Sequence, residues 1–348
     1  TRNLLLVHLL DNVRSELYAF RLSDGRWSKQ RIDAPKLGTL GVVSTDERSD
    51  QYFFTYQGFL QPTSLYYVSD NRQMQVIKSL PHFFDANGLT TEEFQATSRD
   101  GTQIPYFVVR PKGMQMEGAN PTLLYGYGGF EIEMLPHYSA LTGACWLARG
   151  GVYVLANIRG GGEFGPAWHQ AALKANRHKA YEDFAAIADD LVARKITSPK
   201  HLGTMGGSNG GLLMGNMLTQ YPEKFGAIVV QVPLLDMKRY SHLLAGASWM
   251  AEYGNPDTAD WEFIKGFSPY HLFDAGKDYP ATLFTTSTKD DRVHPGHARK
   301  MMALMEAAGK DVRYYENIEG GHGGAANNAQ AAHMTALAYT FLWNQLAK

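Results

Sequence analysis

The chain has 348 residues, of which 44% are hydrophobic and 19% charged, and its formal net charge is −1. This is the composition of a globular protein with a deep core and room for more than one domain. The nearly balanced charge shows none of the excess positive charge that is typical of nucleic-acid-binding proteins. The apolar run at 4–10 is too short to span a membrane, and no signal-peptide cleavage site follows it. We therefore expect neither a nucleic-acid nor a membrane partner.

Cys145 is the only cysteine, which excludes an intrachain disulfide and a cysteine metal cluster. His294 and His297 lie close in the sequence, but no third ligand accompanies them, so we expect no metal and no cofactor. A chain without disulfides suits a reducing compartment. We expect a cytoplasmic location, and a periplasmic one stays open if residues ahead of Thr1 carry a signal.

The residues before about position 100 have the pattern of short alternating strands separated by turn residues. The predicted strands are 15–20, 51–56 and 63–68. Leu17-Tyr18 resembles Leu65-Tyr66, and the two leucines are 48 positions apart. A period of about 40–50 residues with several strands is typical of β-propeller blades, and roughly four to eight blades close a propeller. We therefore predict that residues 1–95 are the C-terminal blades of an incomplete propeller, in a chain that is the C-terminal part of a longer protein.

Predicted strands and helices alternate in the second predicted domain, residues 96–348. The strands are predicted at 104–109, 122–125, 152–156, 201–205, 225–230, 281–287 and 312–316, and the helices at 181–195, 212–218, 296–309 and 325–346. The runs at 122–125 and 152–156 are continuously apolar, as parallel strands buried on both faces are. The alternation predicts a doubly wound α/β domain with a mostly parallel sheet.

Ser208 lies in the stretch Gly206-Gly207-Ser208-Asn209-Gly210-Gly211, between a predicted strand and a predicted helix. G-x-S-x-G in this context is the nucleophile elbow of an α/β-hydrolase. The turn leaves no room for a Cβ beside the serine. It also presents the hydroxyl at a helix N-terminus, where N–H groups and the helix dipole stabilise negative charge. The stretch therefore predicts an α/β-hydrolase fold with Ser208 as nucleophile.

Asp290 and His322 follow Ser208 in the order serine, acid, histidine, which is the order of α/β-hydrolases. Each comes after a predicted strand, where open α/β sheets place their sites. In this hypothesis His322 takes the proton of Ser208, while Asp290 orients the imidazole and stabilises its charged form. Asp291 competes directly with Asp290 for the role of the acid. The order predicts a Ser-His-Asp triad that acts through an acyl-enzyme.

With these residues placed, the chain resembles the prolyl oligopeptidase family of serine peptidases from about residue 100 to its end. The stretches that carry the resemblance are YGYGGF at 125–130, NIRGGGEFG at 157–165, GGSNGG at 206–211, DDRV at 290–293 and GHG at 321–323. Asparagine after the serine is similar to the prolyl oligopeptidase branch, since dipeptidyl and acylaminoacyl peptidases usually carry tyrosine there and oligopeptidase B alanine. The resemblance implies a catalytic domain under a seven-bladed propeller, and short peptide substrates cleaved on the carboxyl side of proline. We expect a monomer.

The resemblance also implies how an oxyanion would be stabilised. Tyr127 would donate its hydroxyl, and the backbone N–H of Asn209 would supply the second donor. Arg292 would donate a hydrogen bond to a backbone carbonyl of the substrate. The alternatives are that Tyr127 is a buried tyrosine at the end of a strand and that Arg292 forms a salt bridge to a neighbouring acid.

Four further residues would form the substrate pocket by the same resemblance. Trp249 would stack on a proline ring, because a flat indole matches a flat pyrrolidine. Phe130, Tyr253 and Val293 would line the rest. Plain core packing is the alternative for this aromatic group. The substrate contacts that the family takes from the rest of its propeller lie outside this chain. Fewer residues therefore support proline preference than support serine hydrolysis.

Three other functions compete with this interpretation. Gly160-x-Gly162-x-x-Gly165 matches the dinucleotide-binding fingerprint of an NAD-binding oxidoreductase, but Pro166 follows where the fingerprint's helix should already have begun. A small-molecule esterase on the same fold is closer, and a propeller that admits only small peptides argues against it. A catalytically inactive binding protein is the third, although every group needed for catalysis is present.

Overall fold

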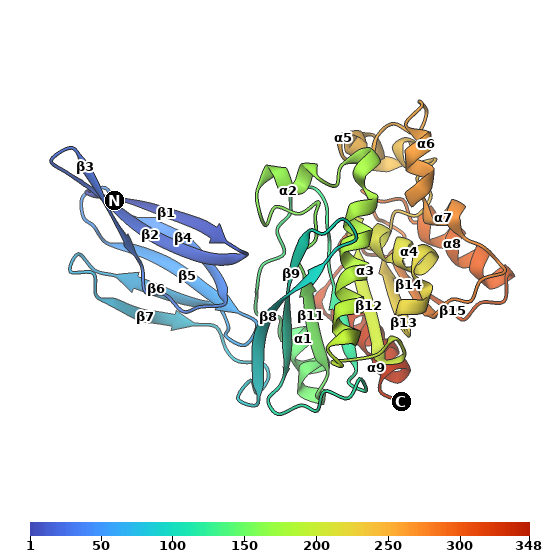
Figure 1. The fold of residues 1–348 in the computed structure, drawn as a ribbon, viewed down its shortest axis with the longest axis horizontal. Coiled ribbons are helices and arrows are strands. Elements are labelled where there is room, and N and C mark those ends of the chain that lie inside the picture. Colours follow the sequence, from blue (N-terminus) through green and yellow to red (C-terminus); the bar gives the residue numbers. More distant parts are fainter. The chain divides into compact units, whose positions relative to one another are not determined.

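The computed structural model describes all residues from 1 to 348, and the chain divides into two compact units. The first unit comprises residues 1–92 and 135–144, and the second comprises residues 93–134 and 145–348 (Figure 1). Residues 135–144 thus belong with the first unit, although they lie beyond the domain boundary predicted at residue 95.

The first unit contains two antiparallel sheets. One is formed by β1 (Leu4–Asp11), β2 (Arg14–Ser23) and β3 (Arg26–Arg31), and the other by β4 (Gly38–Thr45), β5 (Tyr52–Gly58), β6 (Ser64–Val68) and β7 (Met74–Ser79). Each sheet follows chain order, and its last strand is exposed along its whole length. A four-stranded sheet of this kind is the repeating unit of a β-propeller. The 48-residue repeat falls on β2 and β6, each of which lies next to the exposed outer strand of its sheet.

The second unit is built on an eight-stranded sheet with the order β15-β14-β13-β12-β10-β11-β9-β8. Its strands are β8 (Leu89–Thr97), β9 (Gln103–Pro111), β10 (Thr122–Tyr125), β11 (Val152–Ala156), β12 (Leu202–Gly207), β13 (Ala227–Gln231), β14 (Ala281–Ser287) and β15 (Val312–Asn317). From β15 to β11 all neighbours are parallel, whereas β9 pairs antiparallel with β11. All of β11 is buried, in agreement with its continuously apolar sequence.

Helices cover both faces of this sheet. The helices of the second unit are α2 (Pro166–Gln170), α3 (His178–Ala193), α4 (Asn209–Gln220), α5 (Met250–Tyr253), α6 (Trp261–Ile264), α7 (Pro269–Leu272), α8 (Gly296–Ala307) and α9 (Asn328–Leu346), of which α3, α4, α8 and α9 pack on the strands. The helix α1 (Ala140–Cys145) lies almost wholly in the first unit. Successive residues of a strand point to opposite faces. On β12, Thr204 hydrogen-bonds Met214 of α4, while a Cβ on Gly203 would meet Leu346 of α9. The two helices therefore lie on opposite faces, as a doubly wound sheet requires (Figure 1).

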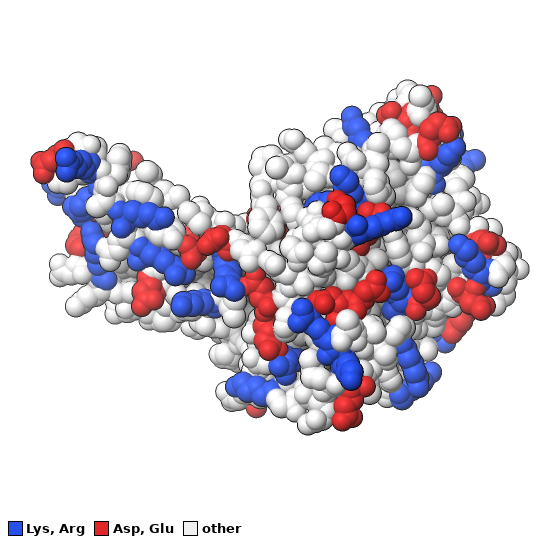
Figure 2. All heavy atoms as spheres, in the orientation of Figure 1, with Lys and Arg blue, Asp and Glu red and all other residues white.

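Charged side chains of both signs are interspersed on the face of the molecule drawn in Figure 2. This distribution matches the nearly balanced total of 33 Lys and Arg against 34 Asp and Glu. None of the helices is both long enough and apolar enough to cross a bilayer.

His297 of α8 is a buried histidine whose ring accepts hydrogen bonds from the backbone. Its Nδ1 accepts hydrogen bonds from the N–H groups of Leu235 and Asp236, at 3.2 and 3.0 Å, so the ring is neutral with its proton on Nε2. Burial lowers the pKa of His297 to about 4. Nδ1 of the neighbouring His294 accepts from the N–H of Gly296 at 2.9 Å. The structure contains no group of three or more His, Cys, Asp or Glu side chains suited to hold a metal ion.

We predict that His297 makes the protein acid-sensitive. The unfolded chain protonates this histidine near pH 6.5, whereas the folded chain does so only near pH 4. The stability it contributes is therefore lost as the pH falls through this window, by at most about 1.4 kcal/mol per pH unit. His297→Asn keeps an acceptor that does not titrate, and should flatten this part of the curve of unfolding free energy, measured in urea, against pH. The exposed His333→Asn is the control, and equal slopes in wild type and His297→Asn would contradict the prediction.

Candidate active site

Ser208 occupies a sharp turn between β12 and α4, with φ of 59° and ψ of −117°. A non-glycine residue rarely adopts a positive φ, so the turn is strained. Close packing surrounds it: a Cβ on Gly206 would lie 2.6 Å from the carbonyl oxygen of Gly210, and one on Gly211 would lie 2.7 Å from that of Gln231. The N–H of Ser208 bonds that same Gln231 oxygen at 3.0 Å. The local conformation is the strand, turn and helix that the G-x-S-x-G stretch predicted.

Asp290 and His322 meet from the loops that follow β14 and β15. Nδ1 of His322 lies 2.8 Å from Oδ2 of Asp290. The other oxygen, Oδ1, accepts the N–H groups of Arg292 and Val293, both at 2.9 Å. Asp290 is buried, whereas the competing acid Asp291 is exposed. Of the two neighbouring acids, Asp290 is the one whose carboxylate is directed at the histidine.

A cavity of about 180 Å³ adjoins His322. It is also lined by Gly207, which precedes Ser208, and by Gln231 at the end of β13. The serine turn and the histidine loop therefore border the same space. The imidazole is bonded to Asp290 and makes no direct hydrogen bond to Ser208. Proton transfer requires the serine hydroxyl to come within hydrogen-bond reach of Nε2 of His322.

Tyr127 and Asn209 lie beside Ser208. Burial raises the pKa of the Tyr127 hydroxyl, and the nearby Ser208 side chain partly offsets this rise. The phenol is therefore protonated at neutral pH and able to donate. Asn209 is the first residue of α4, and the first N–H groups of a helix have no partner within it. The two donors predicted for an oxyanion thus adjoin the serine.

The predicted pocket residues differ in how accessible they are. Phe130 and Trp249 are half-buried, and Arg292 is exposed. The ring of Phe130 packs edge-on against that of Tyr253, with centroids 5.6 Å apart. Tyr253 and Val293 are at most 1% exposed, so both are core residues in this structure. That these residues line a substrate pocket stays a prediction.

Sequence reasoning missed a buried ion pair beside this site. Arg177, which precedes α3, donates to Glu252 of α5 at 2.9 Å, and the two residues are 75 positions apart. Its guanidinium also reaches the side chain of Asn209. The one available signal was an acid inside the aromatic run from Trp249 to Tyr253, where a charge is out of place unless it has a buried partner.

A second buried acid, Glu163, lies in the glycine-rich stretch 157–165. Its Oε1 accepts the N–H of Met134 at 3.1 Å, whereas its Oε2 has no hydrogen-bond partner. Burial raises the pKa of Glu163 to about 7. Ionising this side chain therefore costs the folded state more than the unfolded one.

We predict that Glu163→Gln stabilises the protein at alkaline pH. A free glutamate titrates near pH 4.5 and folded Glu163 near pH 7, so its contribution to stability is complete below about pH 4.5 and is lost as the pH rises through 7. The neutral glutamine should raise the unfolding free energy at pH 8 by up to ~3 kcal/mol and have little effect at pH 4.5. Urea unfolding at both pH values measures this, with the exposed Glu117→Gln as control. A variant no more stable than wild type at pH 8 would refute the prediction.

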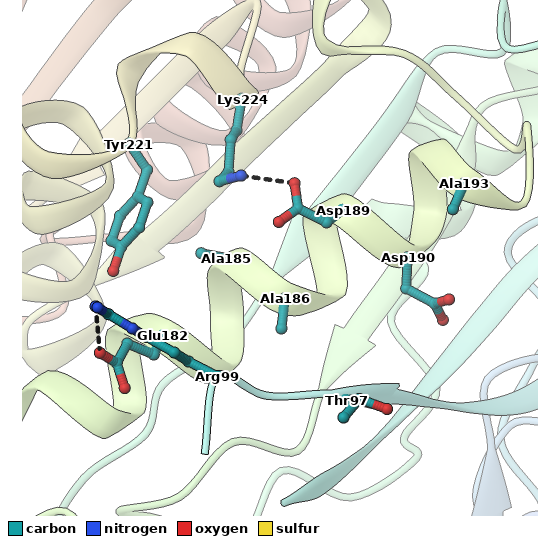
Figure 3. A pocket seen from close by; sticks show the side chains of 10 residues that line it. All are labelled: Thr97, Arg99, Glu182, Ala185, Ala186, Asp189, Asp190, Ala193, Tyr221 and Lys224. Atoms are coloured by element: carbon teal, nitrogen blue, oxygen red, sulfur yellow. Dashed lines mark hydrogen bonds and ion pairs between the residues drawn. The ribbon is translucent and has the colours of Figure 1, made fainter. Parts of the chain in front are cut away.

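A more spacious cavity of about 530 Å³ lies elsewhere on the second unit (Figure 3). Its lining comes from residues 97–99, from α3 and from residues 221–224, and includes none of the predicted site residues. The charged side chains that face it are paired: Arg99 with Glu182 at 3.4 Å, Lys224 with Asp189 at 2.6 Å, and Asp190 with Arg194 at 2.8 Å. The candidate chemistry is therefore not in this cavity.

Comparison with known protein families adds a decisive observation. The profile of the prolyl oligopeptidase family matches residues 136–348, and that of the N-terminal β-propeller domain of prolyl oligopeptidase matches residues 1–79. The chain belongs to the prolyl oligopeptidase family. The predicted resemblance is thereby confirmed, as is the predicted α/β-hydrolase fold preceded by part of a β-propeller.

Individual relatives match between 80% and 99% of the chain. An uncharacterized peptidase, y4nA, of Sinorhizobium fredii is 52% identical over 348 residues, which are 99% of this chain and 48% of the relative. A prolyl endopeptidase of Elizabethkingia miricola is 35% identical over 80% of this chain and 40% of its own length. The structure of a post-proline cleaving enzyme from Rickettsia typhi superposes with a TM-score of 0.91 at 37% identity, over 99% of this chain and 50% of that one. The chain spans about half the length of the curated relatives it matches.

Proposed function

We propose that this chain carries the active site of a serine peptidase that hydrolyses short peptides on the carboxyl side of proline. The observation that carries the proposal is the 2.8 Å contact between His322 and the buried Asp290, next to the cavity that also borders the Ser208 turn. The names of the relatives, prolyl endopeptidase and post-proline cleaving enzyme, support the choice of substrate.

In the proposed reaction, Oγ of Ser208 attacks the carbonyl carbon of the scissile bond while Nε2 of His322 takes its proton. Asp290 holds the tautomer with the proton on Nδ1 and stabilises the imidazolium that forms. The carbonyl oxygen becomes an oxyanion that accepts hydrogen bonds from the Tyr127 hydroxyl and the Asn209 N–H. His322 then protonates the leaving amine, which breaks the C–N bond and leaves an acyl-enzyme. A water deprotonated by His322 releases the acid and restores the serine.

The proline preference would come from the half-buried Trp249. Its indole precedes α5, which is held in the core by the fully buried Tyr253. A half-buried indole suits stacking against a pyrrolidine, since both apolar burial and shape favour the contact. The exposed Arg292 follows Asp290 closely enough for its backbone N–H to bind that carboxylate. Its guanidinium is then free to donate to a substrate carbonyl near the triad.

We predict that the two neighbouring acids differ sharply in their effect on turnover. Ser208→Ala should remove the nucleophile and leave at most a residual ~10³–10⁴-fold rate over water. Asp290→Asn should lower kcat by about 10⁴, because it favours the wrong imidazole tautomer. The matched control Asp291→Asn should change kcat by less than about threefold, because its side chain is exposed. Hydrolysis of a chromogenic peptide with proline before the scissile bond measures all three, and a larger loss in Asp291→Asn would transfer the role to Asp291.

We predict that Trp249→Ala acts selectively on proline substrates. Loss of stacking and apolar burial should lower kcat/KM by the equivalent of about 2–4 kcal/mol for a substrate with proline before the scissile bond. The same substrate with alanine in that position should be affected much less. Trp261, which is also partly buried against the core, provides a matched Trp→Ala control. An equal loss on both substrates would show that Trp249 is a packing residue.

A further inference from the structure

The side chain of Asn209 is the centre of a buried hydrogen-bond network. Its Oδ1 accepts from Nη2 of Arg177 at 2.5 Å and from the hydroxyl of Tyr253 at 2.7 Å, and its Nδ2 donates to the backbone carbonyl of Tyr127 at 2.8 Å. With two donors at the oxygen and an acceptor at the nitrogen, only one orientation of the amide satisfies its partners. The residue that follows Ser208 is thus tied by its side chain to the residue whose hydroxyl lies beside Ser208.

Arg177 is the charged anchor of this network and is fully buried. Besides Asn209, its guanidinium binds Oε1 of Glu252 at 2.9 Å and approaches the hydroxyl of Tyr181 at 3.4 Å. Glu252 also receives the N–H of Phe130 at 3.0 Å on Oε1 and Nε2 of His169 at 2.7 Å on Oε2. A buried ion pair whose remaining lone pairs are satisfied in this way is costly to displace. Arg177 therefore holds Asn209 against a rigid support.

The loop that carries Tyr127 packs directly against Asn209 and Arg177. A Cβ on Gly129 would lie 2.6 Å from Nδ2 of Asn209 and 3.0 Å from Nη2 of Arg177, so only glycine permits the approach. On either side of that glycine, the carbonyl of Tyr127 binds Asn209 and the N–H of Phe130 binds Glu252. The same network thus holds both the loop of Tyr127 and the first residue of α4.

We propose that Arg177 is a positioning residue for the oxyanion site, which through the Asn209 side chain sets the spacing between the Asn209 N–H and the Tyr127 hydroxyl. This inference rests on the proposed function. Donors stabilise an oxyanion best when they are already oriented before the charge develops, because no reorganisation is then needed. A planar guanidinium can hold an amide oxygen and a carboxylate at once in fixed geometry, which an ammonium on a flexible stem cannot do.

Arg177→Lys tests the inference, because it keeps the positive charge but removes the planar guanidinium that binds two partners at once. The kcat for the proline substrate should fall about 10–100-fold, the range expected for small misplacements of catalytic groups. KM should change less than about threefold, because ground-state binding is not involved. A peptide aldehyde forms a tetrahedral adduct with Ser208 whose oxyanion occupies the same site. The affinity for the aldehyde should fall by the same factor as kcat. If Arg177 served only to stabilise the fold, the losses in aldehyde affinity and in kcat would not be equal.

Arg159→Lys is the matched control. Arg159 is also a buried arginine of the second unit, and it is ion-paired with Asp183 at 2.6 Å and with Asp100 at 2.5 Å. Its replacement should lower the unfolding free energy without changing the ratio of aldehyde affinity to substrate KM. If Arg177→Lys does not fold, Tyr253→Phe, which removes the second donor to Asn209 while keeping the ring, takes its place and should show the same linked loss.

Two outcomes would overturn the inference and are distinguishable from each other. A folded Arg177→Lys protein with wild-type kcat and wild-type aldehyde affinity would remove Arg177 from the oxyanion site and leave the proposed peptidase activity standing. A wild-type protein that does not hydrolyse the proline substrate faster than Ser208→Ala would overturn the proposed function, and this inference with it.

Discussion

The strained turn at Ser208 is the constraint on which the candidate site depends. A positive φ at a serine costs about 1–3 kcal/mol, and the turn is closely packed, because a Cβ on Gly206 or Gly211 would collide with neighbouring backbone. The turn is held at both ends, by the buried strand β12 at the centre of the sheet and by the buried helix α4. One local conformation thus sets the direction of the serine hydroxyl and the position of the Asn209 N–H together.

Sheet order explains how residues far apart in the sequence come to lie at one edge of the sheet. In a parallel sheet the loops after the strands all leave from one edge. Asp290 and His322 follow the adjacent strands β14 and β15, and they are in direct contact. Ser208 follows β12, which is separated from β14 by β13. The cavity of about 180 Å³ lies at this edge, and its wall includes Gly207 of β12, Gln231 at the end of β13 and His322. The strand order therefore places the three residues along one edge of the sheet, with one strand between that of the serine and that of the acid.

The limits of sequence prediction follow from how each element is stabilised. Strands such as β11 are buried on both faces, so their apolar runs identify them without further information. The outer strands β3 and β7 are exposed along their whole length. They carry no alternating pattern and were not predicted. In the same way, the elbow pattern is local and marked Ser208, but the choice of Asp290 over Asp291 depends on burial and on the contact with His322. The pairing of Arg177 with Glu252 depends on tertiary structure alone.

Three buried carboxylates of the second unit show how this fold treats charge. Asp290 receives two backbone N–H groups and a histidine, and Glu252 receives an arginine, a histidine and a backbone N–H. Glu163 has one oxygen without a partner, and it is the carboxyl whose pKa burial raises to about 7. A carboxylate surrounded by donors has a single favourable geometry, whereas one with a free oxygen avoids the cost of burial by binding a proton. Asp183 is also buried and fully bonded, since both of its oxygens accept from Arg159 and one also accepts from Ser98. Full bonding of buried carboxylates is thus not confined to the candidate site, but at Asp290 and Glu252 it holds the partners of His322 and Asn209 in place.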